Sequence, residues 1–220
     1  MTPSERLKGS PPDEVIVHEL GHLVIGVELG LPEGGIEFTE NHPSEVARAY
    51  YNRSDVTPIQ IIIRGLAGMY CQALCFPKSI IDDSLRAQIL KHGLFLELSA
   101  LAGNSPIAKA IRRNGFIGDW RCILHEATSN ASNSKETLRL LHKAHGNLIS
   151  IAKKVNLPRV VLRLLADVKD WMNTDNEDMP YAPAIIYSVN RARLVLRKSS
   201  AATARVRGRW SRPKRVCFST

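Results

Sequence analysis

Residues 12–30 read PDEVIVHELGHLVIGVELG, and this stretch decides how the rest of the chain is interpreted. Its apolar side chains recur at the spacing of one helical face: Ile16, Leu20, Leu23 and Val27. Proline suits the first turn of a helix, and the acidic residues directly after it face the positive end of the helix dipole. The sequence therefore predicts a helix over residues 12–29 that ends at Gly30.

The pentapeptide His18-Glu19-Leu20-Gly21-His22 lies at the centre of this predicted helix. Residues four apart on a helix project to the same side, so both imidazoles can bind one Zn²⁺ ion. Glu19 stands beside the first histidine, where its carboxylate can take a proton from a water molecule on the metal. The alternative is a chance match in a buried helix, but these three polar side chains are costly to bury there unless something binds them. We therefore expect His18 and His22 to bind zinc and Glu19 to act as the catalytic base.

The composition of the 220 residues is that of a globular protein, with 44% hydrophobic and 23% charged residues. A chain of this length buries a sizeable core without disulfide bonds. Four cysteines, at positions 71, 75, 122 and 217, form no paired framework, so we expect a reducing, cytoplasmic setting. No segment has the roughly 18 uncharged apolar residues of a membrane helix. These features exclude collagens, membrane-spanning proteins, disulfide-stapled miniproteins and wholly disordered chains.

The net charge of +9 comes from one end of the chain. Residues 191–220 carry ten Lys and Arg and no Asp or Glu, whereas the remaining residues have a net charge of −1. We expect residues 199–220 to form a flexible basic tail, able to bind nucleic acid, an acidic membrane surface or an acidic partner. A solvated tail with no single partner is the alternative.

The rest of the sequence predicts a mainly α fold with a small β hairpin. The hairpin strands are expected over residues 34–39 and 46–51. Further helices are expected over residues 59–75, 82–102, 104–115, 119–129, 135–155, 158–172 and 182–197. We divide the chain into a lead-in (1–12), a helical domain (13–175), a C-terminal helix (176–198) and the basic tail.

The motif and three later features resemble the FtsH family of ATP-dependent zinc proteases. Residues 14–26, EVIVHELGHLVIG, are similar to its active-site helix, in which HEAGH precedes an apolar stretch. A short β segment follows at 36–39, then an apolar helix with small residues, IIIRGLAG, at 61–68. Residues 115–127, GFIGDWRCILHEA, resemble the segment in which an aspartate that opens a helix is the third zinc ligand. The resemblance spans about residues 14–170 and implies a zincin-like, FtsH-type peptidase domain with Asp119 as third ligand.

The chain also departs from that family. It has no GxxxxGK[ST] phosphate loop and no N-terminal membrane anchor, and the gap between His18 and Asp119 is longer than usual. We therefore expect ATP-independent activity from the peptidase part alone. A helix cap is the alternative role for Asp119. The other candidates for third ligand are Asp82, Asp83, His92 and His125, whereas His42, His142 and His145 are expected at the surface.

The expected activity is hydrolysis of peptide bonds. Glu19 deprotonates the water on the zinc ion and then passes the proton to the leaving amine. The β segment of Ile36, Glu37, Phe38 and Thr39 is expected to present an edge to an extended peptide, with an ordinary hairpin as the alternative. A flexible segment or an unfolded protein is the expected substrate.

A different class of function is suggested by residues 151–165, which have the spacing of a helix-turn-helix. Asn156 stands where glycine often lies in the turn, and nearby basic residues suit DNA: Lys153, Lys154, Arg159 and Arg163. The alternative function is a non-catalytic regulatory protein on a peptidase-like scaffold, binding nucleic acid or a protein partner through this segment and the basic tail. Glu19 favours the enzyme, because a structural zinc site has no use for a carboxylate between its ligands.

Overall fold

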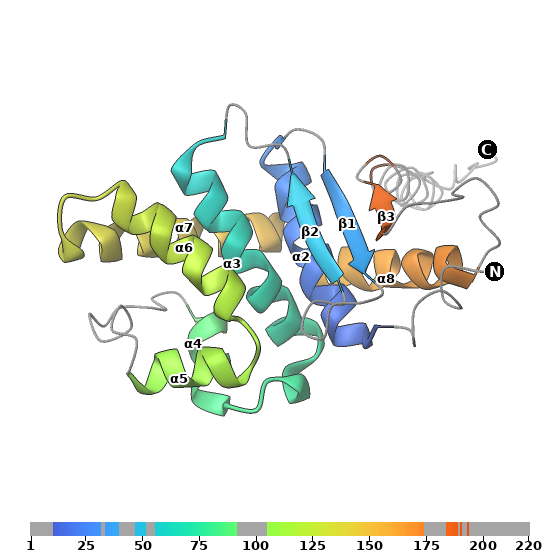
Figure 1. Cartoon of the computed structure of the whole chain (residues 1–220), viewed down its shortest axis with the longest axis horizontal. Coiled ribbons are helices and arrows are strands. Elements are labelled where there is room, and N and C mark those ends of the chain that lie inside the picture. Colours follow the sequence, from blue (N-terminus) through green and yellow to red (C-terminus); the bar gives the residue numbers. More distant parts are fainter. Residues whose placement is uncertain are drawn as a thin grey trace, which may run out of the picture.

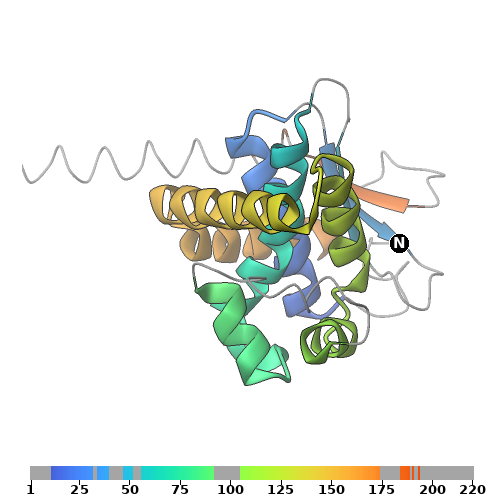
Figure 2. The same ribbon diagram turned by 90° about the vertical axis from the view of Figure 1, so that its left-hand side faces the viewer.

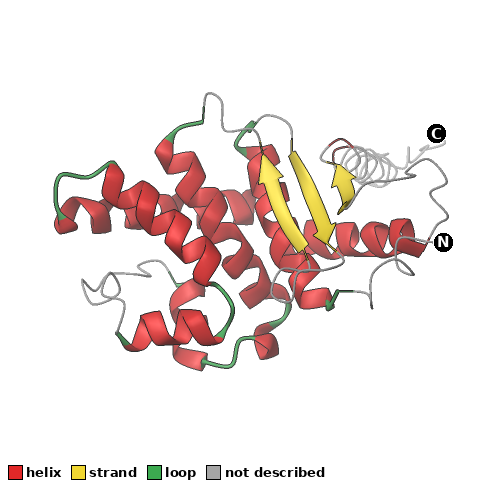
Figure 3. Cartoon of the chain, viewed as in Figure 1, coloured by secondary structure: helices red, strands yellow, loops and turns green. Residues whose placement is uncertain are grey.

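The computed structural model describes residues 11–31, 34–39, 47–51, 56–91, 105–173 and 184–188, and residues 190 and 193. This part of the chain is mainly α-helical with one small antiparallel sheet, as predicted (Figure 3). Its elements in chain order are α2 (Asp13–Glu28), β1 (Gly34–Thr39), β2 (Ala47–Tyr51), α3 (Pro58–Cys75), η1 (Pro77–Ser79), α4 (Asp83–Leu90), α5 (Pro106–Arg113), α6 (Ile117–Ser129), α7 (Ser134–Val155), α8 (Leu157–Asn173) and β3 (Ala184–Ser188).

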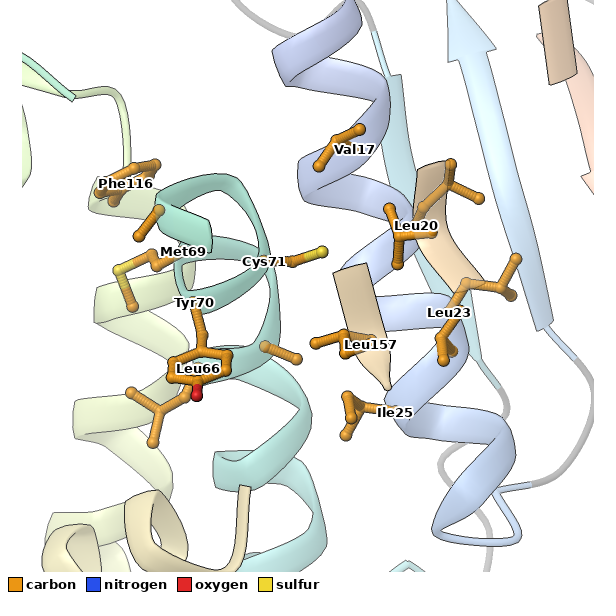
Figure 4. Close-up of a cluster of buried hydrophobic side chains, with 14 of the residues drawn as sticks. Val17, Leu20, Leu23, Ile25, Leu66, Met69, Tyr70, Cys71, Phe116 and Leu157 are labelled. Carbon is orange, nitrogen blue, oxygen red and sulfur yellow. The ribbon is translucent and has the colours of Figure 1, made fainter. Parts of the chain in front are cut away.

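Helices α2 and α3 lie side by side and form the centre of the core (Figures 1 and 4). Leu20 of α2 and Leu66 of α3 are almost completely buried there. The two helices approach closely because Gly21 has no side chain: a Cβ atom at this position would lie 2.6 Å from the Cβ of Cys71. Thr57 is the N-cap residue of α3, and the Gln60 side chain stabilises this end of the helix by accepting a hydrogen bond from the Thr57 N–H at 2.9 Å. The predicted bounds of both helices are confirmed to within one residue.

The sheet lies on the side of α2 opposite α3, in the strand order β2-β1-β3 (Figure 1). Strand β1 pairs antiparallel with both neighbours, so that Ile36 is opposite Ala49 in β2 and Tyr187 in β3. The sheet packs on α8, where the ring centroids of Phe38 and Trp171 are 6.2 Å apart. The predicted hairpin is confirmed.

Two predictions about this sheet are wrong. Ile36, Glu37, Phe38 and Thr39 do not form a free edge, because β1 is the central strand; among the described strands, β2 and β3 form the edges. The helix predicted over 182–197 is a strand at residues 184–188, although residues 190 and 193 are helical. Pairing with β1 and two adjacent β-branched isoleucines favour the strand there.

The remaining helices surround α2 and α3. Helix α6 packs on α3, α7 crosses α3 (Figure 2), and α8 lies behind α2 in the view of Figure 1. The boundary of α7 and α8 is at Asn156, which adopts the left-handed conformation with φ 54° and permits the sharp turn. The helix predicted over 82–102 is confirmed over 83–90 only, because Lys91 is extended and residues 92–104 lie outside the described part.

Other predictions concern the cysteines and the ends of the chain. Of the described cysteines, Cys71, Cys75 and Cys122, none is in a disulfide bond. None of the described helices combines the length and apolarity that crossing a bilayer requires. The lead-in up to residue 10, Cys217 and the basic tail lie outside the described residues.

Candidate metal centre

Two helices bring three potential metal ligands together. His18 and His22 project from α2, and Asp119 projects from the first turn of α6. Asp119 Oδ2 lies 2.7 Å from His18 Nε2 and 3.3 Å from His22 Nε2, and the two imidazole nitrogens are 3.2 Å apart. All ligand atoms of this group lie within 4.8 Å of one another. The structure therefore brings together the three residues that the sequence analysis selected as zinc ligands.

Asp119 is not a helix cap. Helix α6 begins at Ile117, two residues earlier than predicted, and Phe116 occupies the cap position. Asp119 is thus the third residue of the helix, and its carboxylate contacts both histidines instead of the backbone N–H groups of its own helix. Packing of the Phe116 ring on the imidazole of His18, with centroids 5.5 Å apart and planes 13° apart, fixes where α6 begins relative to α2.

The other candidates lie elsewhere. Asp82 caps α4 by accepting a hydrogen bond from the Leu85 N–H group, Asp83 is exposed and paired with Arg86, and His125 is exposed. His42 and His92 lie outside the described residues. The prediction of a surface position for His145 is wrong: this side chain is 1% exposed, and its Nε2 lies 2.9 Å from the carbonyl oxygen of Ile89.

Both histidines are oriented by acceptors on the neighbouring helix α3. His18 Nδ1–H donates to Gln72 Oε1 at 3.1 Å, and His22 Nδ1–H donates to the Arg64 carbonyl oxygen at 2.7 Å. The Gln72 amide is itself fixed, because its Nε2 donates to Ser79 Oγ at 2.9 Å. Because Nδ1 of each ring donates to α3, Nε2 is the atom that faces Asp119 and would bind a metal, as in a zinc-ligating histidine.

Both imidazole rings lie directly against a glycine. A Cβ atom at Gly68 of α3 would lie within 2.5 Å of Nε2 of both His18 and His22. Any side chain at this position would collide with both imidazole nitrogens, so glycine is what lets the two rings lie against α3 with their Nε2 atoms facing Asp119. The donor set of two imidazoles and one carboxylate also suits zinc. The residues present therefore fit a zinc ion.

The charges of the cluster favour a proton on His18, at the nitrogen that would also bind the metal. Burial lowers the pKa of His18, but the Asp119 carboxylate, hydrogen bonding and Glu19 outweigh it and raise this pKa to about 9. Burial on its own would raise the pKa of Asp119, but the two histidines hold it far below its ordinary value. A proton on His18 Nε2 and a metal ion therefore compete for the same site.

Glu19 does not join the three ligands. Its Oε2 accepts a hydrogen bond from the backbone N–H of Ala49 in β2, at 2.5 Å. The carboxylate is thus bound to a different element from the three ligands, although it is close enough to His18 to help raise the pKa of that imidazole. This arrangement leaves it outside the ligand set, as expected for a general base.

No protein-family model matches the chain, and no curated protein or solved structure gives a significant match. The function of the site therefore depends on its own geometry.

The site includes two residues to which the sequence analysis assigned no role, Gln72 and Gly68. A glutamine inside an otherwise apolar helix was the available signal for the first. The second lies in the stretch 61–68 that carries the resemblance to FtsH.

Proposed function

We propose that this chain is a zinc metallopeptidase with an FtsH-type peptidase domain. The observation that carries the proposal is the convergence of His18, His22 and Asp119 on the space beside Gly68, with Glu19 adjacent but not a ligand. Structural zinc sites have four protein ligands, whereas catalytic sites have three and keep one position for water or substrate. Three ligands and a neighbouring carboxylate therefore favour catalysis. We also propose a cytoplasmic location, because the described cysteines form no disulfide bond with one another.

Each polar residue of the site has a role in this proposal. A bound zinc ion supplies a Lewis acid for the attacking water and for the peptide carbonyl group. Glu19 takes a proton from the water and delivers it to the nitrogen of the leaving amine. Gln72 and the Arg64 carbonyl hold His18 and His22 in the orientation that binding needs.

The substrate we propose is an extended peptide, either a flexible segment or an unfolded protein. Strand β2 is an edge strand of the described sheet, and one of its backbone N–H groups already contacts Glu19. An extended chain that adds to this edge would therefore place its peptide bonds beside the candidate metal centre. Backbone pairing makes such binding tolerant of sequence, and no ATPase activity is included in the proposal.

Metal analysis and a protease assay together test the proposed function. Wild type is expected to hold about one zinc ion per chain, and His22→Ala and Asp119→Ala are expected to lose it. Glu19→Gln is expected to keep the zinc but to lose the hydrolysis of casein. Absence of zinc from freshly purified wild type, even after zinc is added back, would contradict the proposal.

A nucleic-acid-binding protein is the alternative, and one feature favours it. Asn156 makes a tight turn between α7 and α8, and four basic side chains around it are exposed: Lys153, Lys154, Arg159 and Arg163. Binding of the full chain to duplex DNA that weakens steeply with salt, without casein hydrolysis by wild type, would favour this alternative.

A further inference from the structure

The hydrogen bond between Glu19 and Ala49 joins the candidate base to the edge strand. In an antiparallel pair, the N–H and C=O groups of one residue point the same way, either toward the partner strand or away from it. Because the Ala49 N–H points to Glu19, it points away from β1, and Ala49 with Ile36 forms a non-hydrogen-bonded pair. By alternation, Ala47 and Tyr51 also direct their backbone groups outward.

These outward groups are the ones that a peptide must use to add to the sheet. No other described strand pairs with this side of β2. A peptide strand seated here would accept a hydrogen bond from the N–H of Ala49 and donate one to its C=O. That N–H group, however, already donates to the carboxylate of Glu19. Peptide and Glu19 therefore compete for one donor.

We infer that the Ala49 amide holds Glu19 in the resting enzyme, and that an extended peptide which pairs with β2 takes over this amide and so releases the carboxylate for catalysis. Ala49 is thus a positioning residue, acting through its backbone. The inference rests on the proposed function and names the event that prepares its base. The peptide backbone is the trigger, so any extended, unfolded chain suffices, whatever its sequence.

A double-mutant cycle on peptide binding tests this competition. Ala49→Pro removes the amide hydrogen, and proline is tolerated because this N–H does not contribute to the β1–β2 ladder. Binding of fluorescein-labelled casein is measured by anisotropy after chelation, so that no variant cleaves the probe. Removing the competing carboxylate with Glu19→Ala is expected to tighten binding about 3- to 10-fold, the range of one net hydrogen bond. In the Ala49→Pro background the same change is expected to have no effect.

Ala47→Pro is the matched control. It also removes an outward N–H group from the edge, at the first residue of the strand, but that group does not contact Glu19 in the structure. Glu19→Ala should therefore still tighten casein binding in the Ala47→Pro background. The inference would be overturned if Glu19→Ala alone left the affinity for casein unchanged. It would also be overturned if Glu19→Ala tightened casein binding as much in the Ala49→Pro background as in wild type.

A spectroscopic measurement keeps the inference testable if Ala49→Pro does not fold. The ¹⁵N–¹H resonance of Ala49 is compared in wild type and Glu19→Ala, each with and without casein. The two resonances are expected to differ in the free chains, because a carboxylate acceptor makes a stronger hydrogen bond. They should coincide when casein is bound, since the amide then donates to the peptide in both. A difference that persists with bound casein would refute the exchange.

Failure of this inference is distinguishable from failure of the proposed function. Zinc content and casein hydrolysis of the wild-type chain are measured on the same preparation. A chain that neither binds zinc nor cleaves casein overturns the proposed function, and the inference with it. A chain that does both, but shows no coupling between positions 19 and 49, overturns this inference alone.

Discussion

Replacement of Gly68 by alanine changes no candidate ligand, yet we expect it to abolish zinc binding. The added methyl carbon would lie within 2.5 Å of the Nε2 atoms of His18 and His22. Ordinary van der Waals contact begins at about 3.4 Å, so α3 or both rings must move by roughly 1 Å. Metal–ligand distances tolerate only about 0.2 Å. Because the substitution displaces both ligand rings at once, zinc affinity should fall by about 100-fold or more, the upper end of the range for a change outside the ligand set.

Gly118→Ala is the matched control for this substitution. Gly118 precedes Asp119 in α6, and a Cβ atom there would meet no other atom within 4 Å. Alanine is favoured over glycine in a helix by up to about 1 kcal/mol, so this variant should keep its zinc and become slightly more stable. Zinc content is measured by elemental analysis after dialysis, and affinity by competition with a chromogenic chelator.

Circular dichroism separates loss of the site from loss of the fold. The Gly68→Ala protein should retain its helical spectrum, since the imidazole rings can turn aside at the expense of their bonds to Gln72 and Arg64. A folded Gly68→Ala protein that binds zinc with wild-type stoichiometry and affinity would refute the conclusion that the placement of these two rings against α3 is needed for zinc binding.

Four further predictions concern the same region. Gln72→Leu removes the acceptor of His18 Nδ1–H and should lower zinc affinity about 10- to 100-fold, as measured by chelator competition. His18 has its pKa raised from 6.5 to about 9, so zinc binding at pH 7.5 should release its proton, detectable by calorimetry in buffers of different ionisation enthalpy. For the same reason, His18 should stabilise the metal-free protein most below pH 6.5, and this contribution should be lost as the pH rises through 9. Denaturant titrations at several pH values should show this fall in the free energy of unfolding for wild type but not for His18→Ala. Gly21→Ala should lower the free energy of unfolding by about 1–3 kcal/mol, because its Cβ would lie 2.7 Å from the carbonyl oxygen of Ala67.

The parts of the fold that could be predicted are those whose signal is local. Periodic apolar residues and a flanking glycine give the bounds of α2, and the Thr57-Pro58 start gives those of α3. Strand β3 has no comparable signal, because its strand state depends on pairing with β1: Ile185 is opposite Phe38, far away in sequence. Its apolar residues recur at helical spacing, but the hydrogen bonds to β1 make it a strand.

In the candidate site, too, the residues could be predicted where their signal is local, and the contacts between helices could not. His18, Glu19 and His22 are adjacent enough for spacing alone to select them, and Asp119 was selected through a resemblance. The orientation of His22 could not be predicted, because its acceptor is the backbone carbonyl of Arg64, which every residue type provides. The burial of His145 was missed for a similar reason, since its acceptor is the backbone carbonyl of Ile89.

The contacts of α2 with α3 nevertheless follow a spacing that the sequence contains. His18 and His22 are four residues apart on one helix, and Arg64, Gly68 and Gln72 are four residues apart on the other. The contacts run in opposite order, with His22 on Arg64 and His18 on Gln72, and Gly68 between them. Residues four apart share a helix face, so one stripe of α3 orients both rings and, at Gly68, lets them approach the helix. A one-residue insertion between Gly68 and Gln72 would turn the glutamine by about 100° away from His18, while every candidate ligand would remain in the chain.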